Sequence, residues 1–392
     1  MNKNQIKAKT RHIYHKSLGL FWLVAFPLNS IWKVFRYRNR RIERKQSNRF
    51  IFIVPDDFDS SQPNLNGSVK VTDSLLEFLR ESSYEVVLHS VGRGFLDSAR
   101  CLFHLSINRN LIQENKNIII SIPGSSGLIA SYLAIFCNKR VFFLAHNAEL
   151  LHRYEWVRNL QSVRLRLRYV KKALFGLTAD FLIANSARHL FVLSEQEIQV
   201  YWKRLNFRRF TSVTYLPYIP TKKIRNGEKS KERNKVVVVG SFSKSIGEKR
   251  VDSDFLDSGE NIRKEIEAMG LEFISVGNGQ SLDFCHKNLG FISDEDMVTL
   301  SSETFAIIVP MSWGWGFKTK LADALFQNQR VFVPRNLYSR CGSWAQALEP
   351  IDLWREFTLS SESGKVYDLI KTVCDNQQEV RDEVVRRAFS DW

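Results

Sequence analysis

Short apolar runs alternate along the chain with segments in which apolar residues recur at helical spacing. The run at residues 50–54 is continuous and ends at Pro55, as expected of a parallel strand that is buried on both faces. Apolar residues then follow one helix face over residues 71–79, and a second strand is predicted at residues 84–91. This βαβα alternation predicts a mostly parallel sheet that is covered by helices.

The alternation occurs twice in the 392 residues, on either side of a polar segment. Further strands are predicted at residues 118–122, 141–145, 191–194, 236–239, 273–276, 306–309 and 331–333. Residues 221–234 contain few apolar side chains and are predicted to form a linker. The fold class is therefore α/β, with two Rossmann-like doubly wound domains, at residues 49–220 and 235–375, that face a central cleft. Residues 376–392 are expected to form a C-terminal helix that could cross back to the N-terminal domain.

The net charge of +16 is concentrated at the N-terminus. Residues 1–48 contain twelve Lys or Arg and a single acid, so they carry eleven of the sixteen net charges. Residues 18–35 are apolar but are interrupted by Pro27 and Lys33, which favours a basic amphipathic helix on an anionic membrane over a signal peptide or a membrane span. An arm that packs on the protein itself is the remaining alternative. The rest of the chain is only modestly basic, which disfavours nucleic acid as a partner.

A second basic and apolar segment lies between Tyr154 and Phe175. Arg and Lys residues alternate there with Trp, Leu and Val. This pattern is typical of an amphipathic helix that docks on anionic lipid, and equally of an ordinary helix with a solvated basic face.

The five cysteines are scattered and show no metal-ligand spacing. An odd number of widely separated cysteines indicates free thiols in a reducing compartment, where they fill the core. No metal site and no cofactor are expected, and the absence of a suitably placed Asp-x-Asp motif agrees with the first of these expectations.

The most specific candidate for chemistry is the sequence VPMSWGWGFKTKLADAL at residues 309–325. A strand ends there, two glycines open the backbone, and a helix is predicted to begin near Phe317. The free N–H groups of a first helical turn bind anions, and Lys318 and Lys320 add positive charge. Asp323 lies about 10 Å along the helix from Gly316, an offset that lets a carboxylate hold ribose hydroxyls while the helix start holds a diphosphate.

Two other strands of the second half end in glycine. Gly240 and Ser241 follow one strand and Gly277 follows the next. Glycine at these positions lets the backbone approach a ligand closely, although a glycine after a strand commonly forms only a turn.

The order of these blocks resembles that of GT-B fold glycosyltransferases, particularly the family 4-like bacterial enzymes of polysaccharide assembly, over roughly residues 50–350. The resemblance rests on blocks in both halves: the Gly67 loop with the helix after it, His146-Asn147-Ala148-Glu149, Val192-Leu193-Ser194-Glu195, Leu216-Pro217, Val239-Gly240-Ser241-Phe242, Leu289-Gly290-Phe291-Ile292, and the Gly314, Gly316, Lys320 and Asp323 block.

The resemblance implies a role for each matching residue. It implies diphosphate binding near Gly240, Ser241, Gly316 and Phe317, and ribose binding by Asp323, which with His146 is a candidate catalytic residue. Gly277, Lys318 and Lys320 are expected to be further donor-binding residues. It implies that His146 contacts the transferred sugar or its phosphate, and that Gly67 and Glu149 lie on the acceptor side. Members of this group usually retain the anomeric configuration and need no metal.

This chain departs from the family pattern in two places. The family often carries two acids eight positions apart, and the first position is Trp315 here. The basic residue expected after the Gly-Ser-Phe strand end could be Lys244 or Lys249.

The leading hypothesis is a hexosyltransferase-type glycosyltransferase that moves a sugar from a nucleotide-sugar donor to a lipid-linked or glycan acceptor. The expected setting is bacterial surface polysaccharide synthesis at the cytoplasmic face of the inner membrane, with the protein peripheral or monotopic. A sugar-nucleotide epimerase of the same fold and a non-catalytic membrane-bound assembly partner are the alternatives.

Overall fold

The structure is a computed structural model. It describes residues 49–55, 58, 67–91, 117–121, 133, 140–160, 162–206, 211–225, 233–242, 251–311, 314–360 and 364–390. The predicted N-terminal membrane segment and the predicted donor-binding Lys244 lie outside the described residues.

The N-terminal lobe is built on a parallel sheet of six strands. They are β1 (Arg49–Pro55), β2 (Glu85–Val91), β3 (Asn117–Ile120), β4 (Arg140–Ala145), β5 (His189–Val192) and β6 (Ser212–Tyr215). The order across the sheet is β2-β1-β3-β4-β5-β6, and every adjacent pair is parallel. All residues of β3 and β4 are buried, so the continuous apolar runs in the sequence correspond to strands that are covered on both faces.

Helices cover this sheet. They are α2 (Gly67–Glu81), α6 (Glu149–Asn159), α7 (Val163–Ser186), α8 (Glu195–Glu197), the π-helical turn η1 (Ile198–Trp202), α9 (Lys203–Leu205) and α10 (Lys222–Arg225). Helix α2 buries Val71, Leu75 and Leu79 at the spacing that the sequence predicts. Helix α10 occupies part of the predicted linker and buries Ile224.

The C-terminal lobe repeats this construction. Its strands are β7 (Lys235–Phe242), β8 (Glu272–Gly279), β9 (Lys287–Asn288), β10 (Thr304–Ile308), β11 (Arg330–Pro334) and β12 (Glu349–Ile351). Its helices are α11 (Ser253–Asp257), α12 (Gly259–Ala268), α13 (Asp294–Ser302), α14 (Thr319–Phe326), α15 (Arg335–Tyr338), α16 (Gly364–Ser390) and the 3₁₀ turns η3 (Gly342–Ala347) and η4 (Trp354–Glu356). The strand order is β12-β11-β10-β7-β8-β9, with parallel pairing throughout.

The strand order of each sheet fixes where a ligand can enter. Strand order reverses between β1 and β3 in the first sheet and between β7 and β10 in the second. Ligands of open α/β sheets bind at the carboxyl ends of strands beside such a reversal. The predicted site residues at the carboxyl ends of β7 and β8, and those after β4 and β10, occupy that edge in the two lobes.

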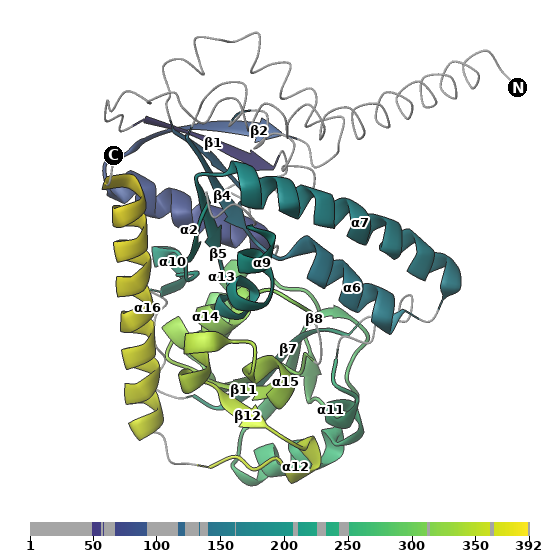
Figure 1. Cartoon of the computed structure of the whole chain (residues 1–392). Coiled ribbons are helices and arrows are strands. Elements are labelled where there is room, and N and C mark those ends of the chain that lie inside the picture. Colours follow the sequence, from purple (N-terminus) through teal and green to yellow (C-terminus); the bar gives the residue numbers. More distant parts are fainter. Residues whose placement is uncertain are drawn as a thin grey trace, which may run out of the picture.

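Helix α16 links the lobes along one side of the molecule (Figure 1). Near its end, the Phe389 ring lies 4.8 Å from the rings of both Phe50 and Phe142, in the first sheet. The helix is continuous from Gly364 to Ser390, so position 376, where the sequence suggested a boundary, lies inside it.

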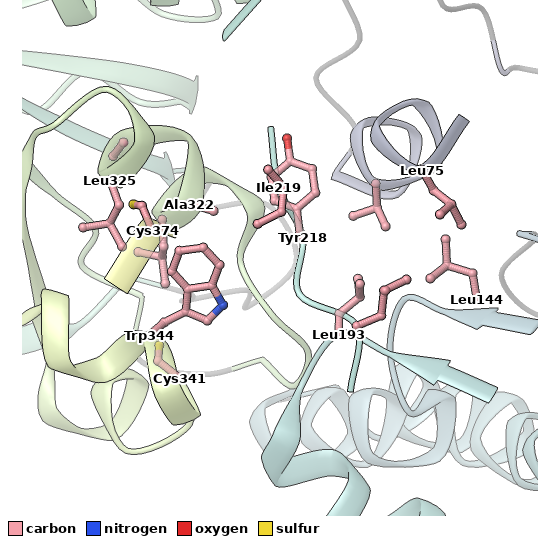
Figure 2. Close-up of a cluster of buried hydrophobic side chains, with 14 of the residues drawn as sticks. Leu75, Leu144, Leu193, Tyr218, Ile219, Ala322, Leu325, Cys341, Trp344 and Cys374 are labelled. Carbon is pink, nitrogen blue, oxygen red and sulfur yellow. The ribbon is translucent and has the colours of Figure 1, made fainter. Parts of the chain in front are cut away.

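One apolar cluster contains side chains of both lobes. Figure 2 shows Leu75, Leu144 and Leu193 on one side, and Leu325 and Trp344 on the other. Because burial of apolar area stabilises their contact, the cluster favours a fixed relative position of the two lobes.

The predicted α/β fold of two Rossmann-like sheets is confirmed. Cys285, Cys341 and Cys374 are free and buried, as expected of core thiols. Within the described part of the chain, no helix is both long and apolar enough to cross a membrane.

Candidate active site

A cleft of about 600 Å³ lies between the two lobes. Most of the predicted site residues line it: Gly67, His146, Glu149, Gly240, Ser241, Gly277, Phe317, Lys318, Lys320 and Asp323. Lys70, Asn147, His152 and Arg153 also line it and were not predicted. The structure therefore brings residues that are up to 256 positions apart in the sequence, from Gly67 to Asp323, into one site.

On the C-terminal side, two adjacent strands present backbone to the cleft. Gly240 in β7 pairs with Gly277 in β8. Gly277 has a φ of +144°, and a Cβ there would lie 1.7 Å from the carbonyl oxygen of Gly240. A side chain at position 277 is thus excluded by the neighbouring strand, while the close approach to a ligand that the sequence suggested stays a prediction.

Two lysines flank the start of α14. This helix begins at Thr319, two residues later than predicted, with Lys318 as the preceding cap residue. The Lys318 Nζ donates to the carbonyl oxygen of Trp315 at 2.9 Å, and the Lys320 Nζ donates to that of Val239 at 3.3 Å. With the N–H groups of the first helical turn, they make this corner of the cleft electropositive.

The glycine-rich turn before α14 is a contact between the lobes. Gly316 has a φ of +85°, and a Cβ there would lie 1.8 Å from Asn147 Oδ1 and 3.2 Å from the carbonyl oxygen of His146. Gly316 is not among the residues that line the cleft. Its predicted diphosphate contact stays a prediction, while the structure shows that the turn packs against Asn147 and the backbone of His146.

A second contact holds the turn from the other side. Glu155 of α6 forms an ion pair with Arg340, with 3.3 Å between Oε1 and Nη1, and its Oε2 accepts from the Gly314 N–H. Arg340 also donates to the carbonyl oxygen of Gly314 at 3.2 Å. Burial lowers the pKa of Arg340, and the nearby Glu155 carboxylate counteracts that effect.

Asp323 is bonded across the cleft. Its Oδ2 lies 2.9 Å from Lys70 Nζ of α2, and its Oδ1 accepts from the Tyr218 hydroxyl at 2.8 Å. Both partners belong to the N-terminal lobe. The predicted ribose contact of Asp323 stays a prediction, and a ribose would have to share this carboxylate with Lys70 and Tyr218.

On the N-terminal side, His146 directly follows β4 and is buried. Its Nε2 lies 2.9 Å from Ser121 Oγ, which lies 2.6 Å from Thr72 Oγ1, and Thr72 donates to the Ser68 carbonyl oxygen at 2.8 Å. This chain of hydrogen bonds joins His146 to the first turn of α2, which begins at Gly67. A Cβ at Gly67 would lie 3.0 Å from Thr319 Oγ1, so the starts of α2 and α14 meet at the cleft.

Three buried residues that sequence reasoning missed hold the loop after His146. The N–H of Ala148 donates to Glu197 Oε2 at 3.2 Å, and the N–H of Leu150 donates to Asp180 Oδ2 at 3.2 Å. The Tyr201 hydroxyl donates to the same Asp180 oxygen at 2.6 Å. These residues come from α7, α8 and η1, and no local pattern marks their association.

The two buried carboxyl groups titrate unusually. Burial raises the pKa of Asp180 to about 8, against the hydrogen bond from Tyr201, and the nearby charge of Glu149 raises it further. Burial also raises the pKa of Glu197 to about 7, although the Ala148 N–H and the charge of Lys318 oppose the shift. Both groups are therefore substantially protonated near neutral pH.

Among the described residues, no group of three or more His, Cys, Asp or Glu side chains is arranged to hold a metal ion. This finding concerns the described residues alone, and the expectation of a metal-independent site stays a prediction.

Comparison with known proteins identifies the fold. No protein-family model matches the sequence, and no curated protein matches it. The structure of HepE from Anabaena in complex with UDP and glucose superposes with a TM-score of 0.54 at 10% identity, over 87% of this chain and 99% of that one. The chain has the GT-B fold.

Two further structures support this assignment. Sucrose-phosphate synthase from Thermosynechococcus elongatus gives a TM-score of 0.52 at 13% identity, over 86% of this chain and 92% of that one. The catalytic domain of starch synthase IV from Arabidopsis thaliana, bound to ADP and acarbose, gives 0.52 at 11% identity, over 88% and 100%. At these identities the likeness establishes the fold of this chain, and the closer resemblance to family 4-like enzymes stays a prediction.

Proposed function

We propose that the protein is a glycosyltransferase that moves a sugar from a nucleotide-sugar donor to a lipid-linked or glycan acceptor. The observation that carries the proposal is the cleft, in which an electropositive corner at Lys318, Lys320 and the start of α14 faces His146 on the opposite lobe. HepE and starch synthase IV, which share the fold, were solved with UDP and ADP.

The proposed chemistry follows from the leaving group. As the bond between the sugar C1 and the diphosphate oxygen breaks, the electron pair and negative charge pass to the diphosphate. The N–H groups of the first turn of α14 and the ammonium groups of Lys318 and Lys320 stabilise this charge from fixed positions. We propose that these groups replace a metal ion, and that His146 contacts the sugar or its phosphate.

The acceptor then attacks C1 through a hydroxyl or phosphate oxygen, and where this oxygen carries a proton, the proton passes to the departing diphosphate. We propose that the reaction retains the anomeric configuration, that Gly67 and Glu149 lie on the acceptor side, and that Asp323 holds the donor ribose. The proposed setting is polysaccharide synthesis at the cytoplasmic face of a bacterial membrane, because the basic N-terminal segment and α7 both suit an anionic lipid surface.

The experiment measures sugar transfer and donor hydrolysis. A thermal-stabilisation screen of UDP-, GDP- and dTDP-sugars first identifies the donor, since a bound ligand raises the melting temperature by mass action. Lys318→Met combined with Lys320→Met should then lower donor turnover by about 100-fold, because removal of one preorganised charge-stabilising donor typically costs that much or more. Lys371→Met, at an exposed position of α16, is the matched control and should keep the wild-type rate.

Two results would contradict the proposal. Equal donor turnover by the double variant and by Lys371→Met would remove the role of the lysine corner. Conversion of the nucleotide sugar with no acceptor and no release of nucleotide would indicate the epimerase instead, and absence of nucleotide-sugar binding by calorimetry would indicate the non-catalytic partner.

A further inference from the structure

Helix α7 carries an apolar face that is exposed to solvent. Val163, Leu167, Val170 and Leu174, here named the α7 stripe, are spaced by four, three and four residues and so lie along one side of the helix. Their exposed fractions range from 41% to 69%. Such a row would be buried in an ordinary amphipathic helix of a globular protein, and here it is not.

The core-facing side of α7 is a different one. The helix buries Ala173, Gly176 and Ile183, and a Cβ at Gly176 would lie 3.0 Å from the Glu149 Cβ, at the start of α6. Further along, the Tyr169 ring stacks on Trp156 of α6 with 5.1 Å between the ring centroids. Packing against α6 therefore already satisfies one face, and the α7 stripe is additional to it.

Positive charge surrounds the stripe. Five exposed basic residues flank it, namely Arg164, Arg166, Arg168, Lys171 and Lys172. The sequence contains no acid between Glu155 and Asp180. Burial lowers the pKa of Lys172, and the nearby charges of Arg153 and Arg168 lower it further. An apolar row between cations, in a stretch of sequence that contains no acid, is complementary to a membrane surface, which is apolar below a layer of anionic headgroups.

We propose that the α7 stripe and its flanking basic residues dock the protein on an anionic membrane, with Val163, Leu167 and Leu174 entering the headgroup region. Apolar side chains at this depth contribute by leaving water, and each nearby Lys or Arg adds electrostatic attraction. A nucleic acid would use the cations and leave the stripe in water, so lipid fits both features of the surface.

The docking surface is next to the cleft. Helix α6, on which α7 packs, begins at Glu149, and Glu149, His152 and Arg153 line the cleft. Figure 1 shows α6 and α7 side by side, projecting from the body of the protein. Docking through α7 brings the Glu149 side of the cleft close to the headgroups, where a lipid-linked acceptor is anchored. This link between membrane docking and a lipid-linked acceptor rests on the proposed function.

The first test is co-sedimentation of the full chain with vesicles. Mixed phosphatidylcholine–phosphatidylglycerol vesicles are compared with phosphatidylcholine vesicles alone. Leu167→Ser combined with Leu174→Ser should weaken partitioning onto the mixed vesicles by about tenfold or more, since two leucines lose their apolar contact. Leu353→Ser combined with Leu369→Ser, at exposed leucines of the C-terminal lobe, is the matched control and should bind as the wild type does. Equal binding by the two double variants would overturn the proposal.

A second measurement does not depend on variants. Photoactivatable phosphatidylglycerol in the vesicles should label peptides that contain residues 163–174 of the wild type. Labelling confined to other peptides would overturn the proposal. A second result would also overturn it: sedimentation without lipid that shows a dimer of the wild type and a monomer of the Leu167→Ser, Leu174→Ser variant. The α7 stripe would then bind a second copy of the chain. Donor hydrolysis without lipid should be equal in this variant and the wild type. If neither the variant nor the wild type hydrolysed a donor, the proposed function would be contradicted, but the result on vesicle binding would not be affected.

Discussion

The two walls of the cleft line the same space but differ in the groups that they present to it. The C-terminal wall, defined by Gly240, Gly277, Lys318 and Lys320, presents backbone and the ends of two lysines. The N-terminal wall carries His146 and the residues after it, and it is held by hydrogen bonds into the lobe from the His146 ring and from the backbone N–H groups of Ala148 and Leu150.

This difference separates two ways of fixing a site. The C-terminal wall depends on side chains being absent, because Gly240 and Gly277 pair too closely for a Cβ at position 277. The N-terminal wall depends on buried polar partners, chiefly Asp180 and Glu197, which satisfy backbone N–H groups that would otherwise be costly to bury. Added volume should therefore damage the first wall, and lost hydrogen bonds or changed protonation should damage the second.

The largest effect is expected from added volume at Gly277. Gly277→Ala should lower the free energy of unfolding by about 3 kcal/mol or more, since backbone strain at a positive φ and overpacking each cost about 1–3 kcal/mol. Gly270→Ala is the matched control: its φ is +70°, and a Cβ there would meet no described atom within 4 Å. It should cost about 1–2 kcal/mol from the backbone alone. Urea denaturation measures both, and equal losses would show that the approach of Gly240 is not what excludes a side chain.

The contrast between the walls also explains what the sequence could predict. Continuous apolar runs such as residues 50–54 are buried strands in the structure. They could be predicted because a strand that is buried on both faces is apolar at every position of a short sequence window. The glycines at the carboxyl ends of β7 and β8 could be selected for the same reason, since a glycine at the end of an apolar run is visible within a few residues. The short strands β6, β9 and β12 were missed, because two to four residues with polar members carry too little periodicity.

The N-terminal wall was only partly predictable. His146 ends a recognisable strand, but Asp180, Glu197 and Tyr201 meet through tertiary packing alone. The same limit applies to the start of α14, which lies two residues beyond the predicted position. Gly316 contacts Asn147 in the other lobe, and no local sequence window contains that contact.

A smaller effect, with its own pH dependence, is expected at Asp180. Its pKa is raised to about 8, so the folded protein binds a proton that the unfolded chain releases above pH 4. Its contribution to stability should therefore be fully present below about pH 4 and be lost as the pH rises towards 8. Asp180→Asn should flatten this part of the profile, leaving the part due to Glu197, whereas Asp180→Ala should cost about 2–3 kcal/mol by leaving buried donors unpaired.

Denaturation midpoints between pH 4 and pH 9 measure this effect. Asp368→Asn, at an exposed position of α16, is the control and should leave the profile unchanged. If the stability of Asp180→Asn fell with pH as steeply as that of the wild type, protonation of the Asp180 carboxyl would not contribute to the stability of the N-terminal wall.

The smallest expected effect lies where the two walls meet, at the ion pair between Lys70 and Asp323. Both side chains are largely buried, and Tyr218 also donates to Asp323, so the pair should be worth more than a surface pair. In a double-mutant cycle with Lys70→Met and Asp323→Asn, we expect a coupling of about 1 kcal/mol in the free energy of unfolding. The exposed Arg49–Glu85 pair, which lies within the N-terminal lobe, should show no measurable coupling. Zero coupling at Lys70–Asp323 would mean that this ion pair does not help to hold the walls together, and that other contacts such as the apolar cluster, α16 and the Glu155–Arg340 pair do so. If a bound nucleotide sugar abolishes a coupling that is present without it, the ligand has taken over the Asp323 carboxylate, as the proposed ribose contact requires.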